Sequence, residues 1–434
     1  MPDQFTDVTT TGYGGRIINS IKGVIIGLIL FIVSFGLLYW NEGRVDLSNI
    51  AKTATEISSA TISTDASLSG KLISTTGNVN SDQVIGDNLY LSPDKFIAAE
   101  RQVEMYSWVE KSESHSRTNT GGSETTETTY TYSKSWEENP KSSSNFKHPE
   151  GHENPQKSLD SYTNKVTAAT IGAYNFDPQS VTLPNFSKLP LNSQNVTLSD
   201  GAILANDSYI FIKKSADGTF DRPQIGDLRI SYHVLRPGFE GTIFGKLSRS
   251  KIDLYFDQDG NNLYRLFIGT REQGISTLHT EYTTLLWILR LVGFLLMWFG
   301  LMALFGPISV LLDILPIFGA ISRSIIGVAT FLVAFVLTIV TILVSMIAHS
   351  LIALIIALVI AIGAIIAFLV MWKNKKKASG VVATATAPVQ TAPPASQLEN
   401  YVRDARARGM SNDEIRQQLL SAGWPNDEVN KILG

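Results

Sequence analysis

The chain has 434 residues, a formal net charge of −3 and no cysteine. The lack of cysteine excludes disulfides, thiolate metal sites and cysteine nucleophiles. The slight acidic excess argues against a nucleic-acid-binding protein, which usually carries clear positive charge. Apolar residues make up 44% of the chain and are concentrated in a few long blocks. This distribution predicts a membrane protein with polar segments between its spans.

The first apolar block covers residues 23–40 and follows a polar stretch that contains Arg16 and Lys22. It is longer than the apolar core of a usual signal peptide and lacks a small-x-small cleavage site at its end. It finishes in an aromatic pair typical of the membrane interface. We therefore interpret it as an uncleaved signal anchor. Gly23 and Gly27 either seat another helix or reflect the general frequency of glycine in spanning helices.

Three further apolar blocks follow at residues 285–305, 324–348 and 351–372. Each is long enough to cross a bilayer core of about 30 Å, which takes about 20 helical residues. A soluble core does not explain them, because they lack a polar face. The sequence thus predicts four transmembrane helices, one near the N-terminus and three toward the C-terminus.

Positive charges set the expected direction of the spans. Basic residues precede the first block, and lysines at 373, 375, 376 and 377 follow the last, so both chain ends are expected in the cytoplasm. The intervening polar segments then alternate across the membrane. We expect a cytoplasmic N-terminus at 1–22, an extracytoplasmic domain at 41–282 and a cytoplasmic loop at 306–323.

The expected outer domain at 41–282 is rich in Thr, Ser, Asn and Tyr and contains many short runs of β-branched and aromatic residues. Gly, Pro, Asn and Asp bound these runs, which predicts a β-rich domain. A hairpin is expected at 252–266, with its turn at 259–262. Residues 112–124 are polar and predict a flexible hairpin loop, whereas 166–173 fit either a helix or a strand.

The C-terminal part changes character after the last span. Residues 378–396 consist largely of Ala, Val, Thr and Pro and predict a linker. Residues 397–434 then carry two capping boxes, each followed by apolar residues at helical spacing, and Trp424-Pro425 begins a short third helix. This segment predicts a small cytoplasmic all-α module, near the lower size limit for independent stability, which a partner or self-association would help to fold.

Candidate catalytic chemistry is sparse. His148 and His152 lie four residues apart, a spacing that binds zinc on a helix, but Pro149 and Gly151 between them argue against a helix. No phosphate loop, dinucleotide fingerprint or catalytic triad order is found. We therefore expect no enzyme, no cofactor and no metal.

Arg290 is the one charge well inside a predicted span. A charge within the membrane is a candidate functional residue, but Arg290 lies near the outer end, where its side chain can extend to the interface. Thr338, Thr341 and Ser345 add only hydroxyl groups. The spans are therefore too uniformly apolar to favour a channel or transporter.

Several motifs together resemble one family, the transmembrane protein 43 (LUMA) family. The matching pieces keep their order along the chain: NEGR at 41–44, RQVEMYSWVE at 101–110, TYTYSKSWEE at 129–138, GHENP at 151–155, GDLRISY at 226–232 and LLDILPIFG at 311–319. The resemblance covers about residues 15–372 and implies a four-span protein of the endoplasmic reticulum and inner nuclear membrane. It implies a self-associating scaffold that binds other membrane proteins, and it carries no catalytic residues.

The sequence departs from the animal pattern at both ends. Its N-terminal segment is short, and residues 378–434 have no counterpart in the animal members. The C-terminal module is similar to helical hairpins found on many prokaryotic membrane proteins. A prokaryotic source is therefore expected, in which case the protein belongs in the cell membrane and partners related to the nuclear lamina do not transfer.

The combined hypothesis is a non-enzymatic membrane scaffold. Its expected partners are membrane lipids, other membrane proteins, further copies of itself and a cytoplasmic partner for the C-terminal module. The alternatives are a channel or transporter subunit and a ligand-binding or hydrolase domain on a membrane anchor. The residues selected as structural or interaction candidates are Tyr106, Trp108, Trp136, Gly226, Arg290 and Trp424.

Overall fold

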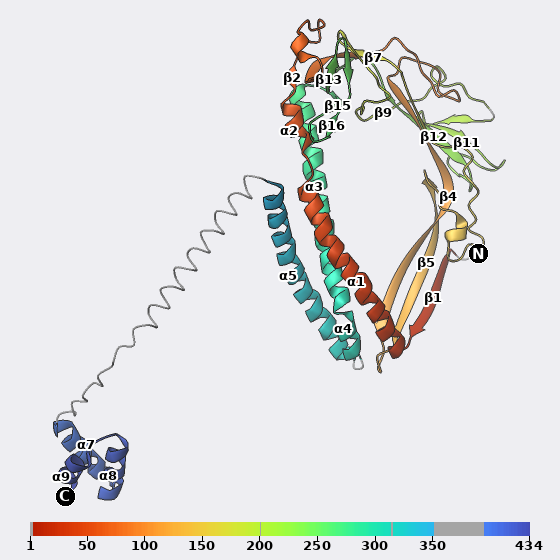
Figure 1. Cartoon of the computed structure of the whole chain (residues 1–434). Coiled ribbons are helices and arrows are strands. Elements are labelled where there is room, and N and C mark those ends of the chain that lie inside the picture. Colours follow the sequence, from red (N-terminus) through yellow and green to blue (C-terminus); the bar gives the residue numbers. More distant parts are fainter. Residues whose placement is uncertain (1–2, 200, 314–315, 351–394) are drawn as a thin grey trace. The chain divides into compact units, whose positions relative to one another are not determined.

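The computed structural model describes residues 3–199, 201–313, 316–350 and 395–434 (Figure 1). The chain forms two compact units, Met1–Leu354 and Ile355–Gly434, which are described separately below. The predicted fourth span at 351–372 and nearly all of the predicted linker lie outside the described residues. The fold is α+β, with long apolar helices and a large β-rich region.

Three helices in the described part of the chain are long and apolar enough to cross a membrane. They are α1 (Tyr13–Glu42), α3 (Arg271–Leu304) and α5 (Pro316–His349). Both α1 and α3 begin well before the apolar blocks predicted at 23–40 and 285–305, because polar helical turns precede them. The described part of this unit also contains two short helices, α2 (Leu47–Lys52) and α4 (Gly306–Leu312).

Helices α1 and α3 approach closely where two glycines face each other. A Cβ atom added to Gly27 would lie 2.8 Å from the carbonyl oxygen of Gly300, and one added to Gly300 would lie 2.8 Å from the backbone nitrogen of Phe31. Such contacts are too short for any side chain, so glycine permits the helices to pack backbone against backbone. Gly27 therefore seats α3, whereas Gly23 has open space beside it.

Arg290 on α3 forms an ion pair with Glu42 at the end of α1. Its Nε and Nη2 donate to the two carboxylate oxygens at 2.8 and 2.7 Å, and its guanidinium lies 4.7 Å from the ring centroid of Trp287. The Glu42 side chain is only 4% exposed. Asn41 adds a hydrogen bond from Nδ2 to the Leu286 carbonyl at 3.0 Å. The charge inside the predicted span is thus neutralised by a residue of the NEGR motif.

The first large sheet has eight strands, and all its pairings are antiparallel. Six strands run in the order β1 (Gln4–Thr11), β5 (Glu124–Glu137), β4 (Ala98–Thr118), β12 (Leu228–Leu235), β11 (Tyr209–Ile212) and β10 (Ile203–Ala205). Two short strands join at the side: β6 (Tyr162–Lys165) on β4 and β9 (Ser187–Lys188) on β12.

The second sheet has seven strands, and its buried apolar side chains share a core with residues of the first sheet. Its order is β17 (Arg265–Ile268), β13 (Phe239–Ser248), β14 (Lys251–Asp253), β8 (Tyr174–Phe176), β7 (Ala169–Ile171), β3 (Leu72–Asn80) and β2 (Thr55–Glu56). A separate pair, β15 (Tyr255–Phe256) with β16 (Asn262–Leu263), forms a short hairpin inside the one predicted at 252–266. The predicted ends, Ile252 and Leu266, instead lie in β14 and β17 of the seven-stranded sheet. Two 3-10 turns complete the unit, η1 (Ala66–Leu68) and η2 (Ser143–Asn145).

The prediction of a flexible loop at 112–124 is wrong. Strand β4 continues to Thr118 and β5 begins at Glu124, so only a short turn separates them. Side-chain hydroxyls bond across the strands, as between Ser116 and Thr126 at 2.7 Å. The backbone ladder and these hydroxyl pairs maintain a hairpin without an apolar face, which is why its polar composition was misread as a loop.

The N-terminal segment also differs from the expectation for residues 1–22. Residues 4–11 form strand β1, which pairs with β5 from Gln4 opposite Thr131 to Thr11 opposite Glu124. The segment therefore belongs to the same sheet as the β-rich region. Thr and Val favour strands, but a single short polar run carries too little periodic signal to predict its partner.

A buried polar network joins three segments of the core. Asp87 accepts hydrogen bonds from the backbone N–H groups of Leu89, Tyr90 and Leu91 at 2.8–2.9 Å. Its other oxygen accepts from Arg101 at 2.9 Å and from the Tyr232 hydroxyl. Burial raises the pKa of Asp87, but the Tyr232, backbone and Arg101 bonds outweigh it and hold the pKa below its ordinary value.

The second unit contains three helices, α7 (Ala395–Ala407), α8 (Asn412–Ser421) and α9 (Asn426–Leu433). Ser411 and Glu414 form the capping box predicted at the start of α8. Leu398, Ile415 and Val429 belong to a small buried core, and Trp424 packs against it partly exposed. Three helices thus form in the segment predicted to be helical at 397–434. The first predicted capping box, at Ser396 and Glu399, is wrong, because Ser396 lies within α7.

We expect Asp87→Asn to lower the free energy of unfolding by about 3 kcal/mol at pH 7, because Arg101 then lacks its buried partner. A lowered native pKa contributes stability above the unfolded value near 4, and this stability is lost as pH falls through the native pKa. The unfolding temperature of the variant should therefore lack the part of the pH dependence that Asp87 contributes. Thermal unfolding in detergent from pH 7 to pH 3, with the exposed Asp82→Asn as control, measures this; parallel curves for variant and parent would contradict it.

We expect Arg290→Leu or Glu42→Leu alone to cost about 3 kcal/mol, since each leaves one buried charge unpaired. The double variant should recover much of that loss, because neither charge remains. Thermal unfolding of the four proteins in one detergent forms a double-mutant cycle. Additive losses would show that the two side chains do not act as a pair.

Candidate functional site

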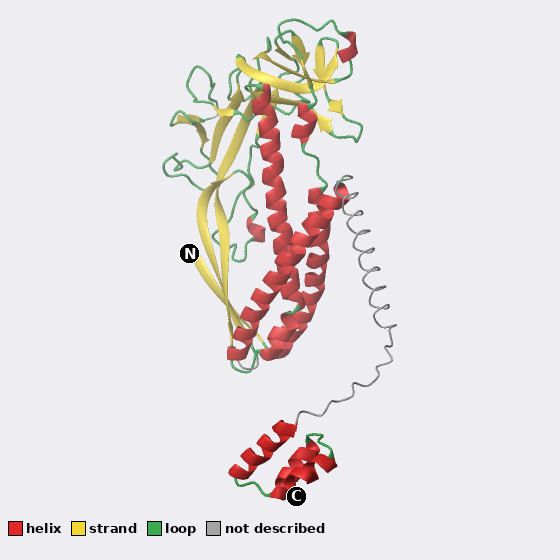
Figure 2. Ribbon diagram, turned by 90° about the vertical axis from the view of Figure 1, so that its left-hand side faces the viewer, coloured by secondary structure: helices red, strands yellow, loops and turns green. Residues whose placement is uncertain are grey.

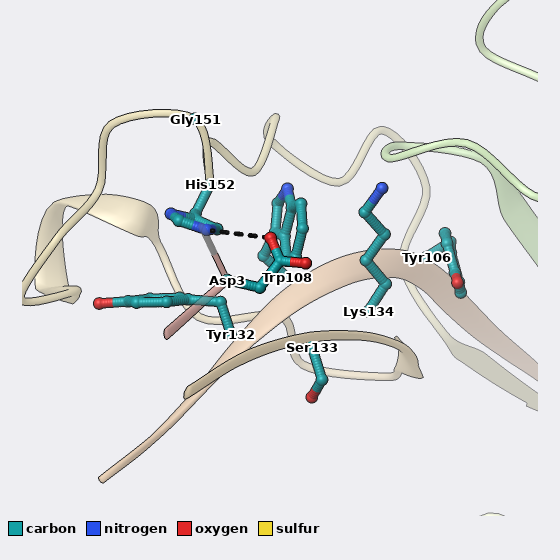
Figure 3. A pocket seen from close by; sticks show the side chains of 8 residues that line it. All are labelled: Asp3, Tyr106, Trp108, Tyr132, Ser133, Lys134, Gly151 and His152. Carbon is teal, nitrogen blue, oxygen red and sulfur yellow. Dashed lines mark ion pairs between the residues drawn. The ribbon is translucent and has the colours of Figure 1, made fainter. Parts of the chain in front are cut away.

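The sequence motifs converge on a groove in the eight-stranded sheet (Figure 3). The groove has a volume of about 560 Å³ and draws on the N-terminal segment, β4, β5 and the loop at 151–152. Its lining residues are Asp3, Tyr106, Trp108, Tyr132, Ser133, Lys134, Gly151 and His152. Three of the motifs named above, at 101–110, 129–138 and 151–155, thus form one surface.

Strand alternation explains why these side chains share a face. Tyr106 and Trp108 are two residues apart on β4, whereas Ser107 between them points to the opposite face and is buried. The β4–β5 register places Trp136 opposite Tyr106 and Lys134 opposite Trp108. The Lys134 ammonium lies 4.6 Å from the Trp108 ring centroid, a cation–π contact on an otherwise open face.

His152 is held within the aromatic wall and is only 1% exposed. Its ring stacks on Tyr132 at 4.0 Å and meets the edge of Trp108 at 4.7 Å. Its Nδ1 lies 3.2 Å from the His148 carbonyl oxygen, and its Nε2 lies 3.7 Å from a carboxylate oxygen of Asp3. The His148 carbonyl oxygen and the two aromatic rings therefore hold the imidazole in place.

Tyr132 is tied to Glu110 beneath the groove. Its hydroxyl donates to Glu110 Oε2 and accepts from the backbone N–H of His148 at 2.9 Å. Burial, followed by the bond to Glu110, raises the pKa of Tyr132 to about 12. The phenol is therefore protonated at neutral pH and acts as a structural donor rather than as a base.

His148 is the second histidine of the wall, and it contacts the N-terminal strand. Its ring stacks on Phe5 with centroids 4.5 Å apart, and its Nε2 lies 3.3 Å from a carboxylate oxygen of Asp7. Each histidine thus faces an aspartate of the N-terminal segment. The two imidazoles clamp β1 onto the sheet instead of converging on one point in space.

The groups required for a hydrolase are not brought together in this groove. Glu104 forms a bidentate pair with Arg229 at 2.6 and 2.8 Å, outside the groove lining. Glu153 accepts from the backbone N–H of Gly151 at 2.9 Å. Within the described ranges, no group of three or more His, Cys, Asp or Glu side chains is positioned to hold a metal.

The remaining candidate residues lie in separate places. Trp136 packs on Tyr106 beside the groove and receives the Arg229 guanidinium at 4.8 Å from its ring centroid. Gly226 has φ of 94°, a left-handed conformation that favours glycine, in the turn before β12. Arg290 lies in the helix bundle and Trp424 in the second unit. Of the six candidate residues, the structure therefore brings only Tyr106, Trp108 and Trp136 together.

Sequence reasoning missed the contribution of the N-terminal segment and of Lys134. Asp3 and Phe5 contact residues far along the chain, so only a predicted β1–β5 pairing would have identified them. Lys134 lies within the TYTYSKSWEE motif, two residues from Trp136. Its alternation with the aromatic residues was a usable signal for a common face.

Comparisons with known proteins agree with this convergence of motifs. The family described as Transmembrane protein 43 matches residues 105–351. Transmembrane protein 43 of Rattus norvegicus is 27% identical over 332 residues, which cover 71% of this chain and 79% of the relative. The human protein is 25% identical over 334 residues with the same coverage, and the Drosophila melanogaster homolog is 26% identical over 295 residues, 64% of this chain and 74% of its own. No solved structure matches. The chain belongs to the transmembrane protein 43 family.

Proposed function

We propose that this protein is a non-enzymatic membrane scaffold whose β-rich region binds segments of other membrane proteins at the groove around Trp108 and Lys134. The observation that supports it most directly is the state of the groove's ionisable groups. His152, Tyr132 and Glu110 are all engaged in fixed internal contacts. They build a rigid wall, and these three side chains are used for its structure.

The accessible chemistry of the groove fits a peptide segment. Trp108 supplies an aromatic surface, and the exposed Lys134 ammonium above it can bond to a carboxylate or a backbone carbonyl. Asp3 supplies an exposed carboxylate on the other side. A rigid aromatic with charges at its rim is typical of protein-binding surfaces. The partner would therefore present a polar segment with at least one acidic residue.

The membrane setting of the proposal rests on the family and on the three apolar helices. We place the protein as a multi-pass protein in the cell membrane of a prokaryote, or in the endoplasmic reticulum or inner nuclear membrane of a eukaryote. The segment at 351–372 would provide the fourth span, and the basic cluster after it would keep the C-terminal module in the cytoplasm. Lipids would contact the exposed apolar faces of the helices.

The C-terminal module would recruit a cytoplasmic partner. Its core is small, and Trp424 and Ile432 pack only partly buried against it. Small modules of this size gain stability when a partner covers such residues. Binding at this module would couple a cytoplasmic protein to the complexes that the β-rich region organises.

A transport path through the helices themselves has less support. The hydroxyls of Thr341 and Ser345 each donate to a carbonyl oxygen one turn earlier in α5, both at 2.7 Å. Thr338 faces Met297 of α3 at 3.6 Å. These groups are satisfied within the bundle and do not converge on a polar path.

We expect Lys134→Glu to reduce partner capture in native membranes about tenfold, which corresponds to about 1.4 kcal/mol for a lost charged contact. Site-specific photo-crosslinking from Tyr106, whose side chain lies on the same face as Trp108 and Lys134, with quantification of crosslinked partners, measures the change. Lys141→Glu is the matched control, because it makes the same charge change at an exposed lysine outside the groove lining. Equal crosslinking by the two variants, or only the uncrosslinked monomer in every sample, would reject the groove as a binding site.

A further inference from the structure

The tip of the β4–β5 hairpin is fastened to the first turns of α1. Arg16 donates to the Gly122 carbonyl at 2.7 Å and pairs with Asp313 at 2.5 Å and Glu124 at 3.2 Å. Arg16 is 8% exposed, so these are buried contacts. Tyr13 adds a hydrogen bond to the Leu311 carbonyl at 3.3 Å. The tip, the beginning of α1 and the end of α4 therefore meet at one end of the helix bundle.

The other end of the bundle is attached to the same β-rich body. Arg271 at the start of α3 donates to Ser74 of β3 at 3.0 Å and to the Lys52 carbonyl of α2 at 3.1 Å. Strands β4 and β5 connect that body to the hairpin tip. The β-rich region thus contacts the helix bundle at both of its ends, through α1 at one end and α3 at the other, which a simple division into an outer domain and a membrane bundle does not allow.

We call β1, residues 111–118 of β4 and residues 124–131 of β5 the polar ribbon. Figures 1 and 2 both show it running beside the helix bundle, down to the beginning of α1. Ser112 lies six positions from the end of β4, which is roughly 20 Å at strand spacing. Counted from the beginning of α1, about 13 helical residues cover the same distance. Ser112 is therefore level with the apolar block at 23–40.

Neither face of the ribbon suits hydrocarbon. Residues 124–129 read Glu-Thr-Thr-Glu-Thr-Thr, and residues 111–117 are exposed, so both faces of the strands carry polar groups. Strands that contact lipid alternate apolar and polar residues, and unpaired strand edges do not occur in the hydrocarbon. Strand β1 is the edge of its sheet. If α1 crosses a bilayer, the ribbon beside it requires water.

One copy does not enclose the ribbon, because its described helices lie to one side of it (Figure 2). A further single helix is about 10 Å across and is too narrow to surround three strands. The helices, in turn, keep exposed apolar side chains such as Ile25 and Ile29, which suit lipid. The two surfaces require opposite surroundings at the same height.

We propose that several copies of this chain assemble with their apolar helices toward lipid and their polar ribbons around a shared water-filled interior at membrane depth. Strands, not spanning helices, then supply the polar lining. The inference goes beyond the partner binding proposed above and depends only on α1 crossing the bilayer. Loss of groove binding would leave it unaffected.

Single cysteines test the proposal directly, because the full chain has none of its own. The probe is a membrane-impermeant maleimide added to the purified full chain in sealed proteoliposomes. Ser112→Cys reports the middle of the ribbon, Thr120→Cys the hairpin tip and Ser69→Cys the opposite end of the β-rich region. Ile29→Cys is the control for a lipid-facing position. All four residues are exposed in one copy, so the substitutions should not impair folding.

We expect the labelling rate of Ser112→Cys to lie within about tenfold of the rate of Ser69→Cys. The rate of Ile29→Cys should be about 100-fold lower than that of Ser69→Cys, because a thiolate does not form in hydrocarbon. With a maleimide on a bulky polymer that the interior cannot admit, vesicles that label Ser69→Cys from outside should label Thr120→Cys only after lysis. Light scattering in nanodiscs should give a mass of more than one copy.

Three outcomes overturn the proposal. Slow labelling of Ser112→Cys would mean that water does not reach the ribbon. Labelling of Thr120→Cys and Ser69→Cys by the polymer-linked maleimide from the same side of intact vesicles would mean that the ribbon does not cross the bilayer. A single copy per nanodisc would remove the shared interior.

Discussion

The buried guanidinium of Arg16 is the contact on which the shape of the first unit depends. It joins three parts of the chain that are far apart in sequence: the start of α1, the hairpin tip and the segment after α4. A buried cation is stable only when it is paired and hydrogen-bonded. Arg16 has two carboxylates and a carbonyl around it, so the bundle and the hairpin meet in one defined arrangement.

A second arginine fixes the other end of α1. Arg290 and Glu42 lie on different helices, and their planar groups meet through two parallel hydrogen bonds. This geometry sets the rotation of α3 against α1 more strictly than apolar contact does. Between the two arginines, Gly27 and Gly300 set the distance between the helices. Charges at the ends and glycines in the middle therefore determine how the bundle packs.

The sequence predicted the elements whose signals are local. Long apolar runs identified the helices, and Ser411 with Glu414 identified the start of α8. The short hairpin inside 252–266 followed from its turn residues. Family resemblance then identified the segments that form the groove, although it did not indicate that they share one surface.

Long-range pairings were beyond this kind of reasoning. Glu42 was visible as part of a motif, yet nothing local marks it as the partner of Arg290. Strand β1 was missed because its polar residues gain their strand conformation from β5, more than a hundred positions away. The hairpin at 112–124 was misread for the same reason, since cross-strand hydroxyl pairs exist only after the register forms.

The position of β1 has a consequence for the order in which the molecule is made. Thr6 and Thr129 face each other across 123 positions, so β1 leaves the ribosome long before its partner strand exists. Only Gly12 separates β1 from α1, so the waiting strand is attached directly to the first helix that would enter the membrane. Closing such a long loop is slow compared with helix formation. The edge of the large sheet is therefore completed late, and β1 stays unpaired until more than a hundred further residues have been made.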